Sequence, residues 1–220
     1  MTFPKYPFPK AIIFDWDNTL IDSFPVVYDA LVATYEAFEK QPPTFEELKQ
    51  RQGFSLRDSF PEEFGDKWEE AKRVYLEAFE AMHLKRIRPL PDAFQLLKYA
   101  ADAVDCLCVL SNKTGRILRD EAAYLKWTPF FYSIVGSFDT PEDKPSPVPA
   151  YYALNKTGLL DANNHPTAPV WFVGDGAVDM ECAAALGAFP VYVSEKPLDA
   201  RTLTVKNCGE LLTLLKSYEK

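Results

Sequence analysis

KAIIFDWDNTLID, residues 10–22, is the stretch of sequence around which the chain is organised. It begins with a short run of bulky and β-branched side chains, AIIF, which predicts a buried parallel strand. Two carboxylates, Asp15 and Asp17, follow directly, and Asn18 and Thr19 favour a turn. In open α/β sheets the reacting groups lie just beyond the carboxyl ends of the strands. Two acids there repel each other and lose solvation, so we expect a hard divalent cation such as Mg2+ to neutralise them; the alternative is an ordinary strand end with solvated acids.

The composition is that of a globular protein. Of the 220 residues, 47% are hydrophobic and 25% are charged, and the formal net charge is −8. Because the chain offers no broad positive field to phosphate backbones or anionic lipids, we expect neither a nucleic acid nor a membrane as partner. A small phosphorylated substrate is compatible with this charge, since it needs only local positive groups.

Four cysteines, at positions 106, 108, 182 and 208, form no CxxC pair, and their spacing suits neither a zinc site nor a disulfide framework. Cys106 and Cys108 fall on one face of a predicted strand, where a free thiol behaves as a small apolar group. The Pro-rich N-terminus MTFPKYPFPK has no apolar segment of the kind that export signals require. We therefore expect free core cysteines and a reducing, cytoplasmic location.

Helical patterns dominate residues 23–87, where no convincing strand is found. Ser23 is the expected N-cap of a first helix. Thr44 and Glu47 form a capping box that predicts a short second helix. A third helix is predicted over residues 68–82, so this segment reads as a small helical subdomain inserted after the first strand.

Strands and helices alternate from Pro89 onward. This alternation predicts an α/β fold with a doubly wound parallel sheet, right-handed crossovers and helices on both faces. The further strands are predicted over residues 105–110, 131–135, 170–173 and 190–194, and the helices over residues 91–103, 116–127, 150–157, 180–186 and 211–218.

Two of the loops that follow carry groups suited to an anion. The second predicted strand ends in Ser111, Asn112 and Lys113, where a hydroxyl, an amide and the N–H groups of the next helix could bind one; a plain N-cap is the alternative. The loop EDKPSP holds Lys144 between prolines, and its ammonium group would stabilise the charge of a phosphoryl group. The alternative for Lys144 is an exposed surface lysine.

The fourth predicted strand ends in GDGAVD, residues 174–179. The glycines allow a tight turn beside Asp175, and Asp179 lies four residues later on the same side of a starting helical turn. The alternative is an acid that only interacts favourably with a helix dipole. Because all of these loops follow strand ends that converge on one edge of a parallel sheet, we expect them to form a single site.

The combination closely resembles the haloacid dehalogenase superfamily of phosphohydrolases, over nearly the whole chain. The motifs DWDNT, a serine after the second strand, KPSP and GDGAVD stand in the family's order. By that resemblance, Asp15 is the nucleophile that becomes an aspartyl-phosphate, and Asp17 is the acid to the leaving oxygen and then the base for water. Ser111 and Asn112 bind the phosphate, and Lys144 balances its charge.

The resemblance also implies a Mg2+ ion, bound by Asp15, Asp175 and the backbone carbonyl of Asp17. Asp179 and Thr19 would support these ligands without binding the metal directly. The chemistry of the residues agrees, because a carboxylate is a known covalent nucleophile and loss of an alkoxide requires the proton that Asp17 can donate. A dehalogenase releases halide and needs no such acid, so Asp17 favours a phosphatase.

Two positions depart from the pattern of many relatives: residue 18 is Asn rather than Gly, and residue 176 is Gly rather than Ser. The resemblance divides the chain into an α/β core, residues 1–21 and 88–220, and an inserted helical cap, residues 22–87, that reads the leaving group. Lys49, Arg51 and Arg57 are candidate contacts for that group, although a solvated charged face is the more common role of such residues.

The expected activity is that of a Mg2+-dependent phosphatase acting on a small phosphorylated metabolite, with phosphoglycolate phosphatases as the most similar subfamily. The alternatives are a phosphomutase similar to β-phosphoglucomutase and a non-catalytic binding protein on the same fold. His83 and His165 lie outside the convergent loops and are expected at the surface. The sequence leaves the oligomeric state open.

Overall fold

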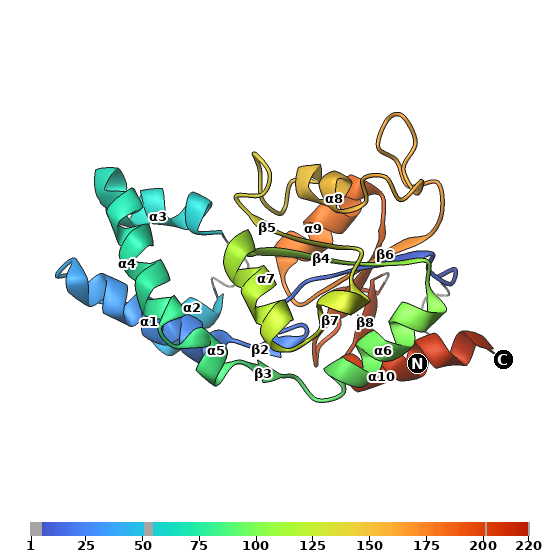
Figure 1. Cartoon of the computed structure of the whole chain (residues 1–220), viewed down its shortest axis with the longest axis horizontal. Helices are drawn as coiled ribbons and strands as arrows, with labels where there is room; N and C mark the ends of the chain where they lie inside the picture. Colours follow the sequence, from blue (N-terminus) through green and yellow to red (C-terminus); the bar gives the residue numbers. More distant parts are fainter. Residues whose placement is uncertain (1–5, 51–54, 201, 220) are drawn as a thin grey trace.

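A single parallel sheet forms the centre of the molecule (Figure 1). The computed structural model describes residues 6–50, 55–200 and 202–219. The order of the six strands is β5-β4-β1-β6-β7-β8, and every neighbouring pair is parallel. The strands are β1 (Ala11–Phe14), β4 (Cys106–Thr114), β5 (Ser133–Ser137), β6 (Val170–Gly174), β7 (Phe189–Val193) and β8 (Leu203–Val205). The predicted α/β fold with a doubly wound parallel sheet is confirmed.

Strand β1 lies between β4 and β6, and all four of its residues are fully buried. Because successive side chains of a strand point to opposite faces, β1 contributes to two separate apolar layers. Ile12 and Phe14 pack toward α6 (Ala93–Ala103), α7 (Gly115–Tyr124) and α10 (Cys208–Lys216). Ala11 and Ile13 pack toward α8 (Val148–Ala153) and α9 (Ala177–Leu186). Burial on both faces explains why AIIF is apolar throughout.

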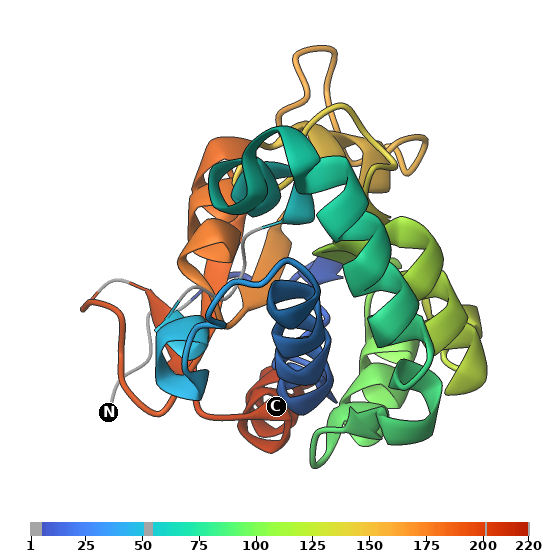
Figure 2. The same ribbon diagram turned by 90° about the vertical axis from the view of Figure 1, so that its left-hand side faces the viewer.

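In the described part of residues 23–87, five further helices form an insert between two short strands. The antiparallel pair of β2 (Ile21–Asp22) and β3 (Arg88–Pro89) carries the chain out of the core and back. Figure 1 shows these helices beside the sheet, and Figure 2 shows them in front of it. They are α1 (Phe24–Ala37), α2 (Phe45–Gln50), α3 (Leu56–Phe64), α4 (Trp68–Glu80) and α5 (His83–Arg86). One short 3-10 turn of the insert covers Gly65–Lys67, and two in the core cover Thr128–Phe130 and Ser217–Glu219.

The insert has an apolar core of its own. Phe60, Tyr75 and Phe79 lie in it, and Ile117 of α7 joins it from the sheet side. The helix α3 is not among the sequence predictions, because Pro61 lies inside it and a proline normally interrupts a helix. Apart from Ile117, the buried residues of this cluster all belong to the insert.

Local expectations are met unevenly. The capping box is confirmed: the Thr44 N–H donates to Glu47 at 2.8 Å, and the Glu47 N–H donates to the Thr44 hydroxyl at 3.3 Å. Ser23 is the N-cap residue of α1, as expected, although its side chain makes no capping hydrogen bond. All four cysteines are free and buried, which confirms the expected core positions of Cys106 and Cys108. Within the described residues, no helix is both long and apolar enough to cross a membrane.

Candidate active site

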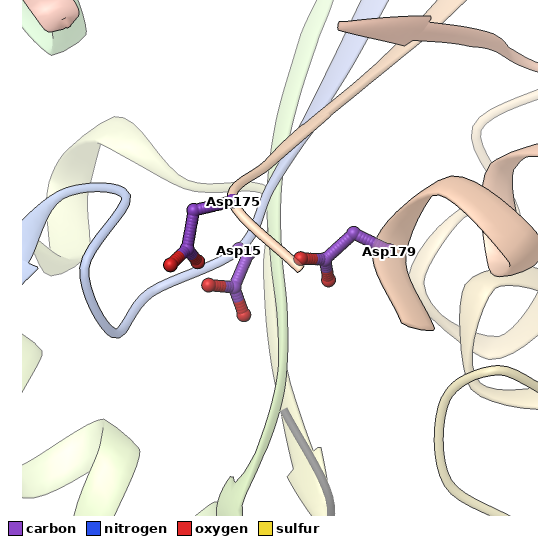
Figure 3. A group of neighbouring side chains, drawn as sticks. All are labelled: Asp15, Asp175 and Asp179. Atoms are coloured by element: carbon purple, nitrogen blue, oxygen red, sulfur yellow. The ribbon is translucent and has the colours of Figure 1, made fainter. Parts of the chain in front are cut away.

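Two strand ends and the start of one helix bring the predicted acids together. Asp15 follows β1, Asp175 follows β6, and Asp179 lies in the first turn of α9. Figure 3 shows their carboxyl groups side by side, and one oxygen of each lies within 4.8 Å of the others. Gly174 permits this approach, because a Cβ atom at that position would lie 2.4 Å from the Asp179 carboxyl group.

The turn after β1 explains why Asn is acceptable at position 18. Asn18 has a φ of 58°, in the left-handed region that Gly and Asn adopt most readily. Its N–H donates to the Ile21 carbonyl at 2.6 Å and closes the turn. The departure from Gly therefore preserves the backbone that carries Asp15 and Asp17.

Lys144 lies between two of the three clustered acids, Asp15 and Asp179. Its Nζ is 2.6 Å from Asp15 Oδ1 and 2.6 Å from Asp179 Oδ1, and the residue is 2% exposed. Burial by itself would lower the pKa of Lys144, but the two carboxylates outweigh it and raise that pKa. Asp179 also accepts the Gly176 N–H at 2.9 Å, so its carboxylate is held from two sides.

Asn112 holds the Lys144 loop in place. Its side-chain amide donates to the Lys144 carbonyl and accepts from the Lys144 N–H, each at 2.9 Å. Ser111 is buried beside it, and its Oγ accepts the Lys113 N–H at 3.1 Å. Both Ser111 and Asn112 line the same cavity as Asp15. Their binding of phosphate stays a prediction, but the geometry gives Asn112 a clear task in fixing the lysine loop.

The cluster of Asp15, Asp175 and Asp179 carries more negative charge than Lys144 can balance. Burial, together with Asp179 and Asp17 and against the opposing effect of Lys144, raises the pKa of Asp15 to about 7. Burial and the neighbouring carboxylates likewise raise the pKa of Asp175, to which Thr19 Oγ1 donates at 3.3 Å. Crowded carboxylate oxygens of this kind are the ligands that Mg2+ prefers. The residues present therefore fit the predicted metal.

A second charged network lies behind Asp17. The Nζ of Lys113 is 2.6 Å from Asp17 Oδ1 and 2.8 Å from Glu121 Oε2. Glu121 is 1% exposed and also accepts the Trp16 indole N–H at 2.7 Å. Burial would raise the pKa of Glu121, but Lys113 and the hydrogen bonds from His83 and Trp16 lower it. Glu121 is thus a buried carboxylate that holds Lys113 and the Trp16 indole in place.

His83 is part of this network, so its predicted place at the surface is wrong. Its Nδ1 lies 3.0 Å from Glu121 Oε1, and the residue is 5% exposed. One sequence signal could have revealed the pair: Glu121 falls on the same helical face as Ile117 and Leu118, and an acid on a buried face needs partners. His165 is exposed, as expected, 3.8 Å from Asp161.

Comparison with known proteins identifies the group to which this arrangement belongs. A model of the haloacid dehalogenase-like hydrolases matches residues 12–193. The chain belongs to this family. It is therefore an enzyme of the hydrolase class, and the predicted resemblance is confirmed.

Individual relatives agree with the family assignment. A phosphoglycolate phosphatase of Chromobacterium violaceum is 28% identical, over 94% of this chain and 97% of the relative. The crystal structure of a haloacid dehalogenase superfamily hydrolase from Ehrlichia chaffeensis is 26% identical, with a TM-score of 0.66 over 98% of this chain and all of that one. A haloacid dehalogenase-like protein from Streptococcus pneumoniae, 22% identical, shares the fold with a TM-score of 0.77 over 96% and 99% of the two chains.

A cavity of about 540 Å³ separates the hydrolase core from the insert. The core contributes both of the described lysines that line the cavity, Lys113 and Lys144, together with acids that include Asp15 and Asp17. Among the described residues that line the cavity from the insert there is no lysine or arginine. That wall is largely apolar and aromatic, with a few acids: Phe24, Val27, Leu31, Tyr35, Leu48, Leu56, Phe60, Tyr75, Leu76 and Phe79, with Asp58, Glu62 and Glu63.

Arg57, one of the three predicted cationic contacts of the insert, does not line this wall. The Arg57 guanidinium donates to the carbonyls of Thr140 and Pro141 and stacks 4.5 Å from the Phe138 ring. It therefore ties α3 to a core loop instead of facing the cavity. Arg51 and the side chain of Lys49 lie outside the described residues.

Proposed function

We propose that this hydrolase is a Mg2+-dependent phosphatase that hydrolyses a small phosphorylated metabolite through an aspartyl-phosphate on Asp15. The observation that carries the proposal is the environment of Asp15 at the end of β1. It pairs with Lys144 at 2.6 Å, and a second acid, Asp17, follows two residues later and faces the same cavity. A nucleophile, a proton carrier and a fixed cation are what stepwise phosphoryl transfer requires.

In the first step the Asp15 carboxylate attacks phosphorus, and the bond to the leaving oxygen breaks as Asp17 donates its proton to that oxygen. In the second step water attacks the aspartyl-phosphate, Asp17 takes a proton from the water, and Asp15 is freed with release of phosphate. Lys144 balances the charge on Asp15, and Ser111 donates its hydroxyl to a phosphate oxygen. Together these groups supply the positioning and charge stabilisation on which this reaction depends.

Asp15, Asp175 and the backbone carbonyl of Asp17 would hold the metal, with Asp179 and Thr19 supporting them. When bound, Mg2+ supplies Lewis-acid stabilisation of the phosphoryl charge. The surplus of carboxylate charge described above supports this assignment. Every proton transfer in the scheme is carried by the chain's own residues and water.

We also propose that residues 22–87 act as a cap over a core of residues 1–21 and 88–220. The paired strands β2 and β3 support this division, because both crossings between the two parts lie side by side there. A cap hinged directly after the DWDNT motif would close over the phosphorylated end of the substrate and contact its leaving group. A cytoplasmic location is part of the proposal, and the four free, buried thiols support it.

The substrate is proposed by class. The relative from Chromobacterium violaceum makes phosphoglycolate the first compound to test. The cavity volume of about 540 Å³ lies in the range that small molecules occupy. The apolar wall makes esters with uncharged or aromatic leaving groups the second set to test.

A panel of phosphorylated metabolites with added Mg2+, including phosphoglycolate and 4-nitrophenyl phosphate, is expected to give release of inorganic phosphate from at least one member. The measurement is colorimetric phosphate detection, with NMR of the products. An isomerised sugar phosphate without free phosphate would instead indicate the phosphomutase. Release from no member would favour the non-catalytic binding protein and contradict the proposal.

Stabilisation by Mg2+ is expected to grow with pH. The pKa of Asp15 is about 7 in the fold against an ordinary value of 3.8. Between these values the metal-free folded state holds a proton that the unfolded chain has released, so its free energy of unfolding falls as the pH rises. Mg2+ displaces this proton and therefore binds more tightly at higher pH. At about a hundredfold excess over Kd, Mg2+ should raise Tm by roughly 5–10 °C near pH 8 and by much less near pH 5.

Differential scanning fluorimetry at the two pH values measures this effect, with NaCl at equal ionic strength as the control for screening. Asp175→Asn removes a proposed ligand and should abolish the Mg2+ response at both pH values. An equal Tm shift near pH 5 and pH 8 would contradict the prediction. EDTA should inactivate the enzyme, and added Mg2+ should restore the activity.

A further inference from the structure

Lys113 and Glu121 form a buried ion pair beside Asp17, for which the proposed mechanism has no role. The Nζ of Lys113 lies 2.6 Å from Asp17 Oδ1 and 2.8 Å from Glu121 Oε2. The aromatic ring of Phe79, from α4, lies 5.2 Å from the same nitrogen. With its side chain only 7% exposed, Lys113 is enclosed by two carboxylates and a ring rather than by solvent.

Glu121 holds Lys113 from the side away from the cavity. It accepts hydrogen bonds from Trp16 at 2.7 Å and lies 3.0 Å from the His83 ring nitrogen. Trp16 stands between the two acids of the DWDNT motif, and His83 comes from the insert. Glu121 is 1% exposed and is not among the described residues that line the cavity. Its contacts can therefore act on the substrate only through Lys113 and the DWDNT loop.

The Asp17 carboxyl group depends on Lys113 for its orientation. Among the described residues, no group donates a hydrogen bond of regular geometry to the buried Oδ1 atom, so the ion pair is the contact that restrains it. The Asp17 side chain is 24% exposed and lines the cavity. A proton donor must be aimed at the leaving oxygen, and a displacement of about 1 Å costs on the order of 10²-fold in rate.

We propose that Lys113 is the positioning residue of Asp17, and that Glu121 keeps Lys113 in place. Lys113 holds Oδ1, so that the other carboxyl oxygen of Asp17 carries the proton to the leaving oxygen. The proton leaves Asp17 as the phosphorus–oxygen bond breaks and the bond to Asp15 forms, and it returns from water in the second step. Lys113 itself neither gains nor loses a proton. This inference rests on the proposed function, in which Asp17 is the proton donor.

The test compares phenyl phosphate with 4-nitrophenyl phosphate, two esters of nearly the same shape. The nitrophenolate leaves readily without a proton, whereas phenolate departs far more readily when protonated. Lys113→Met is expected to lower kcat/KM for phenyl phosphate by about 10²-fold and for 4-nitrophenyl phosphate by no more than about threefold. Equal falls for the two esters, or no fall for either, would overturn the proposal.

Stability is separated from positioning by a second variant. Lys113→Met alone leaves Glu121 buried without a cation, which destabilises the fold. The double variant Lys113→Met with Glu121→Gln removes both charges and is expected to recover Tm while keeping the low kcat/KM for phenyl phosphate. Recovery of that kcat/KM together with Tm would mean that Lys113 is only structural, and would overturn the proposal. Lys10→Met, which removes a surface ion pair with Asp105 before β1, is the matched control and should leave both esters unaffected.

Asp17→Asn distinguishes failure of the inference from failure of the proposed function. This variant should show the same dependence on the leaving group, with a larger fall for phenyl phosphate. If Asp17→Asn shows the dependence and Lys113→Met does not, only the positioning proposal is wrong. If Asp17→Asn does not show it, the role of Asp17 as proton donor is wrong, and the inference falls with it.

Discussion

Asp15→Asn is expected to abolish turnover while leaving the fold intact. Loss of the attacking group of a covalent mechanism lowers kcat by about 10⁴-fold or more in enzymes of this kind. We expect no loss of stability, because burial and the neighbouring carboxylates already disfavour the charged form of Asp15, and Lys144 keeps Asp179 as its partner. The amide has nearly the same shape and removes part of that repulsion. In the absence of metal, Tm should therefore stay the same or rise.

Single-turnover assays and circular dichroism test the two parts of this prediction. Asp105→Asn is the matched control, since Asp105 is an exposed acid whose partner is Lys10 at the surface, and the same substitution there should leave kcat within about twofold. Phosphate trapped on the protein during turnover should be found on the wild type and not on Asp15→Asn. Activity near the wild-type level in Asp15→Asn would exclude Asp15 as the nucleophile.

Lys144→Met is expected to reduce both stability and activity. Without Nζ, the carboxylates of Asp15 and Asp179 lose the cation that lies 2.6 Å from each of them. Removing one partner of a buried ion pair costs about 3–5 kcal/mol, because an uncompensated charge remains. Loss of a fixed positive group at the reacting phosphoryl also lowers kcat by on the order of 10²–10³-fold.

Urea unfolding in EDTA measures the stability effect, since bound Mg2+ would offset part of the missing charge. The double variant Lys144→Met with Asp179→Asn removes one of the unpaired acids and should recover part of the free energy of unfolding, but none of the activity. Lys98→Met, at an exposed position of α6, is the matched control. A free energy of unfolding within about 1 kcal/mol of the wild type would show that Lys144 does not carry the buried charge.

Much of the fold could be predicted from the sequence because its signals are local. An apolar run of four residues that ends in acids identifies β1, since a strand covered on both faces has no polar alternation. The capping box at Thr44 is contained within four residues. Elements that depend on their neighbours were missed. The strand β8 has three residues and pairs only with β7, and α3 carries a proline whose cost is offset by packing in the insert.

For the candidate site too, the sequence predicts which residues take part but not which of them are in contact. Asp15, Asp17, Lys144 and Asp175 could be selected from the sequence, because strand ends of a parallel sheet meet at one edge and each of these residues follows or faces such an end. Which of them touch could not be predicted. Lys144 contacts an acid 129 residues away and another 35 residues away, and Asn112 holds the lysine loop across 32 residues.

The sequence by itself determined that DWDNT ends a buried strand and brings two acids to the reacting edge of an α/β sheet. Only the tertiary structure decided which lysine pairs with each of those acids: Lys144 with Asp15, and Lys113 with Asp17, while Glu121 holds Lys113 with the help of Trp16 and His83. The physical reason is that the burial of a residue can be predicted from the pattern of apolar and polar residues next to it in the sequence. Neutralising a buried charge is a pairwise interaction that needs a partner within a few ångströms in space, wherever that partner lies in the chain.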